Sequence, residues 1–169
     1  MVKIPVVDEN DEVIMYKERD EIQPEDIYRV SSLWVMNEFW EFLLTQRSAL
    51  KRNDPNKWTC AVAGTVEEGE SYEDNIIKET KEEIWMDIKD PQLLAIRRRK
   101  GNHHYFWATH LVNLPKDSDF VFDEEEIQKV GWFSIEKIDE WFSLFPNDFV
   151  PSFWETWPFV KEKLKELEL

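Results

Sequence analysis

The stretch GTVEEGESYEDNIIKETKEEIWM, residues 64–86, predicts an acidic helix with one buried face. Ser71 offers a side-chain cap for the free amide groups at a helix start, and Asp74 stands three positions on, as in a capping box. The residues of one stripe recur at helical spacing: Ile76, Ile77, Thr80 and Ile84. A helix therefore begins near Ser71, and one of its faces packs against the rest of the protein.

Glutamates gather on another side of this predicted helix. Glu79, Glu82 and Glu83 are related by steps of three and four positions, so their carboxylates project together. Like charges at this spacing each disfavour a helix by roughly 0.2–0.5 kcal/mol, whereas a hard divalent cation such as Mg²⁺ or Mn²⁺ binds such oxygens. Acid-rich helix faces are also common in a protein this acidic, so the spacing alone leaves both interpretations open.

Outward from the helix, clusters of β-branched and apolar residues separated by turn residues predict strands on both sides of it. The expected strands cover residues 3–7, 12–17, 28–35, 40–46, 58–63, 93–100, 104–114 and 130–133. More helices are expected near the C-terminus: Ser134 caps one, and Thr156-Trp157-Pro158 opens another that runs to Leu167. This mixture predicts an α/β or α+β fold, and 169 residues suit a single domain.

The charge balance is strongly acidic. There are 21 Lys and Arg residues against 36 Asp and Glu residues, a formal net charge of −15, which repels nucleic acid polymers and anionic membrane surfaces. A small phosphorylated ligand would be repelled too, unless divalent cations lay between it and the protein. Cys60 is the only cysteine, no targeting segment is evident, and no apolar run reaches the roughly 20 residues that span a bilayer. We therefore expect a cytoplasmic protein without membrane contact.

The spacing from residue 64 to residue 86 resembles the Nudix box. In that motif a Gly is followed by five residues, Glu, seven residues, Arg-Glu, an apolar residue, any residue, Glu-Glu, any residue, Gly and an apolar residue. The matching positions are occupied here by Gly64, Glu70, Glu79, Glu82, Glu83 and Met86. The resemblance implies a Nudix fold, a mixed β-sheet sandwiched between α-helices, as a single domain over residues 1–169.

Some positions depart from the motif. Lys78 replaces the Arg and keeps its charge without the planar fork that holds a carboxylate bidentately. Thr80 replaces an apolar residue, although its methyl group can still face a core. Trp85 stands where a Gly ends the helix, and a Trp in the left-handed conformation is strained by roughly 1–2 kcal/mol. We expect either a different helix end or a tolerated strain.

The resemblance also implies a chemistry. Members of the family bind a divalent cation at the box and cleave a diphosphate linked to another group, such as a nucleoside diphosphate derivative or another small organic diphosphate, by attack of water on phosphorus. Carried onto this sequence, Glu79, Glu82 and Glu83 are the expected ligands of Mg²⁺ or Mn²⁺, with the carbonyl of Gly64 as an additional ligand. Glu70 is expected to act structurally, as the partner of Lys78. Lys78 itself is expected to take part in catalysis, because its charge could also orient Glu79.

The residue that accepts the water's proton is left open by the sequence. Glu79 is one candidate, and the acidic run at residues 123–126 supplies Glu126 and then Glu125. That run is equally typical of a solvated turn. For the cations that face the phosphates, Arg47 and Lys57 are the leading candidates in a segment that also contains Lys51 and Arg52, and an exposed surface role is the alternative for them.

Other functions remain to be weighed against hydrolysis. The box region also resembles isopentenyl-diphosphate isomerases, which need a Cys before the first Gly of the box and a His after it, but Ala63 and Thr65 stand there. Cys60 lies three residues earlier, which on a strand directs it to the opposite face. A non-hydrolytic nucleotide-binding or regulatory module with the same fold is the other alternative. Since many relatives pair, a homodimer is compatible with the sequence.

Overall fold

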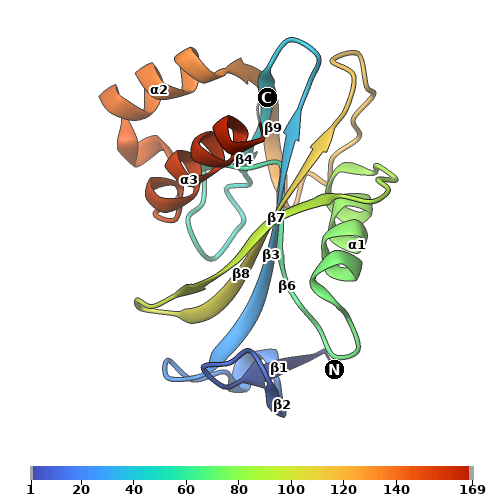
Figure 1. Ribbon diagram of the computed structural model, residues 1–169, viewed down its shortest axis with the longest axis vertical. Coiled ribbons are helices and arrows are strands. Elements are labelled where there is room, and N and C mark those ends of the chain that lie inside the picture. The colour runs from blue at the N-terminus through green and yellow to red at the C-terminus, as the bar shows by residue number, and fades with distance from the viewer. Residues whose placement is uncertain (1, 168–169) are drawn as a thin grey trace.

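The computed structural model describes residues 2–167, and within them nine strands form one mixed sheet with helices on both of its faces (Figure 1). The strands are β1 (Lys3–Val7), β2 (Val13–Glu18), β3 (Ile27–Met36), β4 (Glu41–Arg47), β5 (Trp58–Thr59), β6 (Val62–Thr65), β7 (Gln92–Arg99), β8 (His104–Asn113) and β9 (Ile127–Ser134). The helices are α1 (Tyr72–Ile84), α2 (Ile135–Leu144) and α3 (Phe153–Glu166), with short 3₁₀ turns η1 (Arg19–Glu21) and η2 (Pro146–Asp148). None of the described helices is long and apolar enough to cross a membrane.

Strand β3 organises the sheet because it has neighbours along both of its edges. It runs parallel to β8 from Ile27, beside His104, to Met36, beside Asn113. Its other edge is shared by β1 near its start, β6 in its middle and β4 at its end, all antiparallel. The pairing with β6 places Gly64 beside Ser31, so the first residue of the Nudix-like motif lies over the centre of the sheet.

The two faces of the sheet carry different cores, since side chains alternate between faces along a strand. Leu33 and Val35 of β3 point toward α1 and pack with an aliphatic cluster that includes Ile76 and Ile84. Trp34, between them, points toward α2 and α3 and belongs to an aromatic cluster. The other buried members of that cluster are Met36, Phe42, Leu44, Cys60, Leu111, Ile138, Phe149, Val150, Phe153, Trp157, Val160 and Leu164.

Helix α1 begins as the sequence predicts. The Ser71 hydroxyl accepts a hydrogen bond from the Asp74 amide at 3.0 Å, and the Asp74 carboxylate accepts one from the Ser71 amide at 3.0 Å. The Ser31 hydroxyl donates to the carbonyl of Tyr72 at 2.8 Å, which ties the first turn to β3. Thr80 is fully buried and donates its hydroxyl to the Ile76 carbonyl at 2.6 Å, so it replaces an apolar residue without an unpaired polar group.

The end of α1 answers the question that Trp85 raises. Trp85 adopts the left-handed conformation, with φ 55° and ψ 34°, and its amide donates to the carbonyl of Thr80. The helix therefore ends where a Gly would end it, and the strain is tolerated. The Trp85 side chain is 68% exposed, so packing in the core contributes little to offset that strain.

One predicted strand is divided in two. The sequence predicts a single strand over residues 58–63, but the structure has β5 paired with β4 and β6 paired with β3, with a bend at Cys60 and Ala61. The chain changes its pairing strand there, from β4 to β3. The preference of each residue for strand structure cannot predict such a change. The Thr45 hydroxyl donates to the Cys60 carbonyl at 2.9 Å and so satisfies the bent backbone.

The start of the last helix is also corrected. Helix α3 begins at Phe153 rather than at Thr156, and Pro158 lies inside it rather than in its first turn. Phe153 is 1% exposed, with its ring centroid 4.4 Å from that of Phe149, so burial of this ring favours an earlier start. Pro158 then removes one helical hydrogen bond close to the helix start, a cost that the buried aromatic contacts outweigh.

Candidate active site

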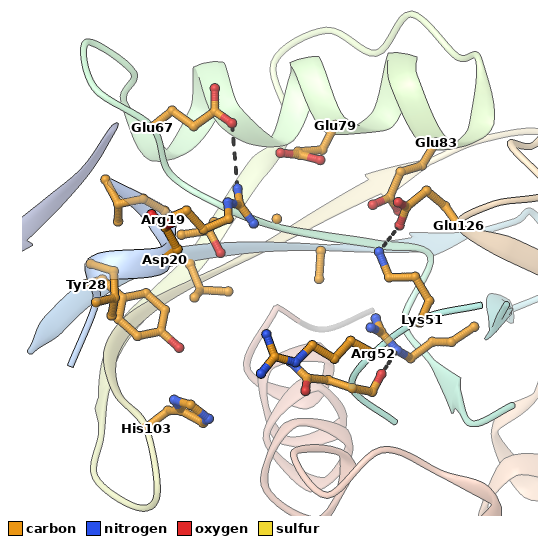
Figure 2. Close-up of a pocket in the computed structure, with 18 of the residues that line it drawn as sticks. Arg19, Asp20, Tyr28, Lys51, Arg52, Glu67, Glu79, Glu83, His103 and Glu126 are labelled. Atoms are coloured by element: carbon orange, nitrogen blue, oxygen red, sulfur yellow. Dashed lines mark hydrogen bonds and ion pairs between the residues drawn. The ribbon is translucent and has the colours of Figure 1, made fainter. Parts of the chain in front are cut away.

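A cavity of about 1280 Å³ lies beside α1, over the end of β6. Figure 2 shows Glu79, Glu83 and Glu126 along the wall formed by α1 and the loop before β9, with Lys51 and Arg52 opposite them. The cavity therefore has an acidic wall and a basic wall. A polyanion held by cations would fit between the two.

Glu79 and Gly64 meet at the base of the acidic wall. A Cβ atom on residue 64 would lie 2.5 Å from the carboxyl carbon of Glu79, closer than any real contact allows. Gly64 is therefore needed for Glu79 to approach the sheet. Burial raises the pKa of Glu79, while Asn75 donates to its Oε1 at 3.3 Å.

Glu83 and Glu126 come together because the loop before β9 docks on the end of α1. The Asp123 amide donates to the Glu83 carbonyl at 3.0 Å, and the Ile127 amide donates to the Asp123 carbonyl at 2.8 Å. Burial, with repulsion from Glu79 and Glu126, raises the pKa of Glu83 to about 8. Glu126 Oε2 forms an ion pair with Lys51 Nζ, which crosses from the basic wall (Figure 2).

The expected pair of Glu70 and Lys78 forms. Lys78 Nζ lies 2.7 Å from Glu70 Oε1, 2.9 Å from Glu67 Oε2 and 3.9 Å from Glu79 Oε1. Burial alone would raise the pKa of Glu70, but the hydrogen bond from Lys78 and the contacts with Glu67 and Asn75 hold it below its usual value. Lys78 thus ties the loop before α1 to the helix, and its Nζ also lies near the Glu79 carboxylate.

The donor set of the acidic wall fits a hard divalent cation. Glu79, Glu82 and Glu83 all line the cavity, with Glu126 and the backbone of Gly64. Across residues 2–167, no three His, Cys, Asp or Glu side chains are drawn together as a ready-made ligand group. Glu82 is exposed at the rim. Burial is the main cause of the raised pKa of Glu83, and repulsion from Glu79 and Glu126 adds to it. A bound cation would relieve that repulsion, and carboxylate oxygens are the ligands such cations prefer.

The basic wall contains Arg47, Lys51 and Arg52, all of which line the cavity. The Arg47 Nε donates to the carbonyl of Asn53 at 3.1 Å, which holds the guanidinium beside the loop. Lys57, the other cation predicted to face the phosphates, does not line the cavity, and its Nζ donates to the carbonyl of Asn147 at 3.0 Å. Lys57 immediately precedes β5, which runs toward η2. The Lys57 side chain is therefore directed away from the cavity.

The far end of the cavity contains residues that were not part of the predicted site. Arg19, Tyr28 and His103 line it, and Figure 2 places them away from the Glu83 and Glu126 pair. Arg19 Nη2 lies 3.7 Å from Glu67 Oε1. The parallel pairing of β3 with β8 sets Ile27 beside the residue that follows His103, so it brings these distant segments together. No local signal in the sequence indicates this contact.

Cys60 lies outside the cavity. It is 4% exposed within the aromatic cluster on the other face of the sheet, and burial raises the pKa of its thiol to about 12. Ala63 and Thr65, the residues on either side of Gly64, line the cavity instead. The side chains that flank the first Gly therefore provide no cysteine and no histidine for isomerase chemistry.

Comparison with known proteins agrees with this geometry. The family described as NUDIX domain matches residues 27–153. A prenyl-diphosphate phosphatase of Methanosarcina mazei is 30% identical over 153 residues, which cover 88% of this chain and 89% of that protein. The solved structure of a Deinococcus radiodurans protein superposes with a TM-score of 0.72 at 23% identity, over 84% of this chain and 89% of that one.

The similarity to isomerases covers much less of the chain. An isopentenyl-diphosphate Delta-isomerase of Salmonella arizonae is 37% identical over 59 residues, which are 35% of this chain and 32% of that enzyme. The mixed sheet between helices, the box spacing and the family match over residues 27–153 lead to one assignment. The chain belongs to the Nudix family and is a Nudix-type hydrolase.

Proposed function

We propose that the protein uses Mg²⁺ or Mn²⁺ to hydrolyse the diphosphate linkage of a small organic diphosphate, for example a nucleoside diphosphate derivative. The observation that carries the proposal is the cavity in which the box carboxylates of α1 face the cations of the 47–52 segment. The similarity to a protein named prenyl-diphosphate phosphatase supports an organic diphosphate as the substrate.

The acidic wall is the proposed cation site. Glu79 and Glu83 provide its inner carboxylates, Glu82 stands at the rim, and the Gly64 carbonyl is an additional oxygen. Divalent cations bound there would neutralise the diphosphate and act as Lewis acids. Lys78 is a positioning residue in this scheme, since its contacts with Glu70 and Glu79 set the carboxylate that packs on Gly64.

Glu126 is the proposed base. Lys51 binds its Oε2, which orients the carboxylate and leaves Oε1 free to accept a proton from the water that attacks phosphorus. Glu125 is exposed at the rim, and Glu79 is confined between Gly64 and Asn75, so both are less suited to the transfer. A base must lie within hydrogen-bond reach of the water that it deprotonates.

The basic wall is proposed to hold the phosphates. Arg47 and Arg52 are not paired with a carboxylate among the described ion pairs, so their guanidinium groups are free to bind phosphate oxygens. An arginine fork matches the geometry of a phosphate and gives orientation as well as charge. These two residues would thus align the diphosphate against the acidic wall.

A panel of organic diphosphates tests the proposal, with released phosphate measured in Mg²⁺ and in Mn²⁺. We expect Glu83→Gln to lower kcat/KM by about 100-fold or more, since it removes a charged ligand from a charge-neutralising site. Glu73→Gln is the matched control, because Glu73 is exposed on the same helix and does not line the cavity.

Two results would contradict the proposal. Full activity of Glu83→Gln would show that the cation site does not depend on Glu83 of α1. A panel in which no diphosphate is cleaved would favour the non-hydrolytic alternative. A Glu126→Gln variant separates the roles within the site: if Glu126 is the base, kcat should fall while KM is retained.

A further inference from the structure

Asn75 is a buried amide on α1, at a position that the box motif leaves open. It is 0% exposed and does not line the cavity. Its Nδ2 donates to the Thr65 carbonyl at 3.1 Å, to Glu70 Oε2 at 3.0 Å and to Glu79 Oε1 at 3.3 Å. One side chain therefore joins the end of β6, the loop before α1 and a carboxylate of the acidic wall.

The orientation of the Asn75 amide follows from its neighbours. All three contacts of Nδ2 are oxygen acceptors, so the reversed amide would place Oδ1 against two carboxylates and a carbonyl. Oδ1 is itself buried and has no hydrogen-bond partner among residues 2–167. A buried polar atom without a partner is unfavourable, so the contacts of Nδ2 are what favours an amide at this position.

Lys78 makes only part of the same set of contacts. Its Nζ lies 2.7 Å from Glu70 Oε1, the oxygen that Asn75 does not bind, but 3.9 Å from Glu79 Oε1, which is beyond hydrogen-bond length. Within residues 2–167, the Glu79 carboxylate accepts its one hydrogen bond from Asn75. The ammonium group of a lysine also lacks the planar fork of an arginine. Lys78 alone therefore holds Glu70 but leaves Glu79 without a donor.

We propose that Asn75 is a positioning residue for the cation site, and that it shares with Lys78 the task of the Arg in the box motif. Lys78 supplies the charge and holds one oxygen of Glu70. Asn75 supplies the planar N–H donors, which hold the other oxygen of Glu70 and reach Glu79. The inference rests on the proposed function, in which Glu79 is a cation ligand.

The position of Glu79 shows what this donor achieves. A Cβ atom on residue 64 would lie 2.6 Å from Glu79 Oε1, so this oxygen packs against Gly64 on one side and accepts from Asn75 on another. A carboxylate held in one orientation has less freedom to lose when it binds a cation. Removal of the amide should therefore weaken cation binding as well as turnover.

The first test measures Mn²⁺ binding without substrate, from the electron paramagnetic resonance signal of free Mn²⁺. We expect Asn75→Ala to raise the Kd for Mn²⁺ about ten-fold and to lower kcat/KM for a cleaved diphosphate by a similar factor. Thermal unfolding in EDTA reports the stability of each variant separately. Asn75→Leu keeps a branched side chain without N–H donors, so it should show the same loss and replaces Asn75→Ala if that variant does not fold.

A second substitution tests whether Asn75 and Lys78 share one task. In the Asn75→Ala background, Lys78→Arg supplies a planar fork that can reach both Glu70 and Glu79, so it should recover most of the lost Mn²⁺ affinity. The gain from Lys78→Arg should be smaller when Asn75 is present, because Glu79 already has its donor. Such dependence of one substitution on another is expected for residues that act together.

Asn37→Ala is the matched control for the loss of a buried amide. Asn37 is 3% exposed, its Nδ2 donates to Glu41 Oε2 at 2.9 Å, and neither residue lines the cavity. This variant should unfold at a lower temperature with its Mn²⁺ affinity unchanged. The comparison separates the positioning of Glu79 from a general effect on the fold.

The inference and the proposed function fail in different ways. Wild-type Mn²⁺ affinity in both Asn75→Ala and Asn75→Leu would overturn the inference and leave the hydrolase proposal intact. A loss of affinity that Lys78→Arg does not recover would overturn the shared task. If the wild-type protein neither binds Mn²⁺ nor cleaves any diphosphate, the proposed function falls and the inference falls with it.

Discussion

The two faces of the sheet differ in what their side chains do. The face under α2 and α3 is built from stacked aromatic rings, with Trp34 and Trp157 5.5 Å apart between centroids. The face under α1 is aliphatic, and α1 directs its carboxylates into a cavity where they repel one another. The aromatic face therefore contributes mainly to the stability of the fold, and the face under α1 carries the candidate active site. The aromatic face can hold β3 and β4 in place while the other face carries an electrostatic cost.

The largest expected effect on stability comes from removing a ring of the aromatic face. Trp157 is 1% exposed and packs against Trp34 and Phe42. Trp157→Ala should lower the free energy of unfolding by about 3–5 kcal/mol, measured by urea denaturation, because it leaves a cavity in a packed core. Trp154→Ala on the same helix is the control, and equal losses in the two variants would contradict the division between faces.

An intermediate effect is expected where the functional face is most crowded. Gly64→Ala places a methyl group against the Glu79 carboxylate, which must move away. We expect kcat/KM to fall by about 10- to 100-fold, with a stability loss of about 1–3 kcal/mol. Gly101→Ala is the matched control, since the nearest atom to its Cβ is 4.0 Å away. Activity retained in Gly64→Ala would show that the position of Glu79 is not critical.

The smallest effect is expected in the aliphatic core under α1. Thr80→Val replaces a buried hydroxyl, which donates only to the Ile76 carbonyl of its own helix, with a methyl group of similar size. That carbonyl can keep its backbone partner, so the free energy of unfolding should change by less than about 1 kcal/mol in either direction. Circular dichroism during thermal unfolding measures the change. A loss comparable to that of Trp157→Ala would mean that the aliphatic face is as intolerant as the aromatic one.

Local features were predicted well wherever neighbouring residues decide them. The cap at Ser71, the buried stripe of α1 and the pair of Glu70 with Lys78 follow from spacing along a single segment. The left-handed Trp85 was one of two foreseen outcomes. The bounds of some strands were close for the same reason: the expected strand at residues 104–114 is β8, His104–Asn113. The last strand was predicted too short, since β9 covers Ile127–Ser134 and the expectation was 130–133.

Features that depend on contacts between distant segments were missed or wrong. Lys57 is directed toward η2, and β5 and β6 separate because they pair with different strands. The early start of α3 depends on burial of Phe153 against Phe149. In each case tertiary packing outweighs local preference, because burying a ring or pairing a strand stabilises the fold by more than residue propensity does.

By itself, the sequence determined the acidic helix, its cap and the positions of its carboxylates, because a helix fixes side-chain direction through a repeat of 3.6 residues. Only the tertiary structure decided what faces those carboxylates. The loop at residues 123–126 reaches Glu83 through a backbone hydrogen bond from the Asp123 amide, and the parallel pairing of β3 with β8 brings His103 to the same cavity as Tyr28. Pairing between distant segments depends on the whole sheet, so no single stretch of residues encodes it.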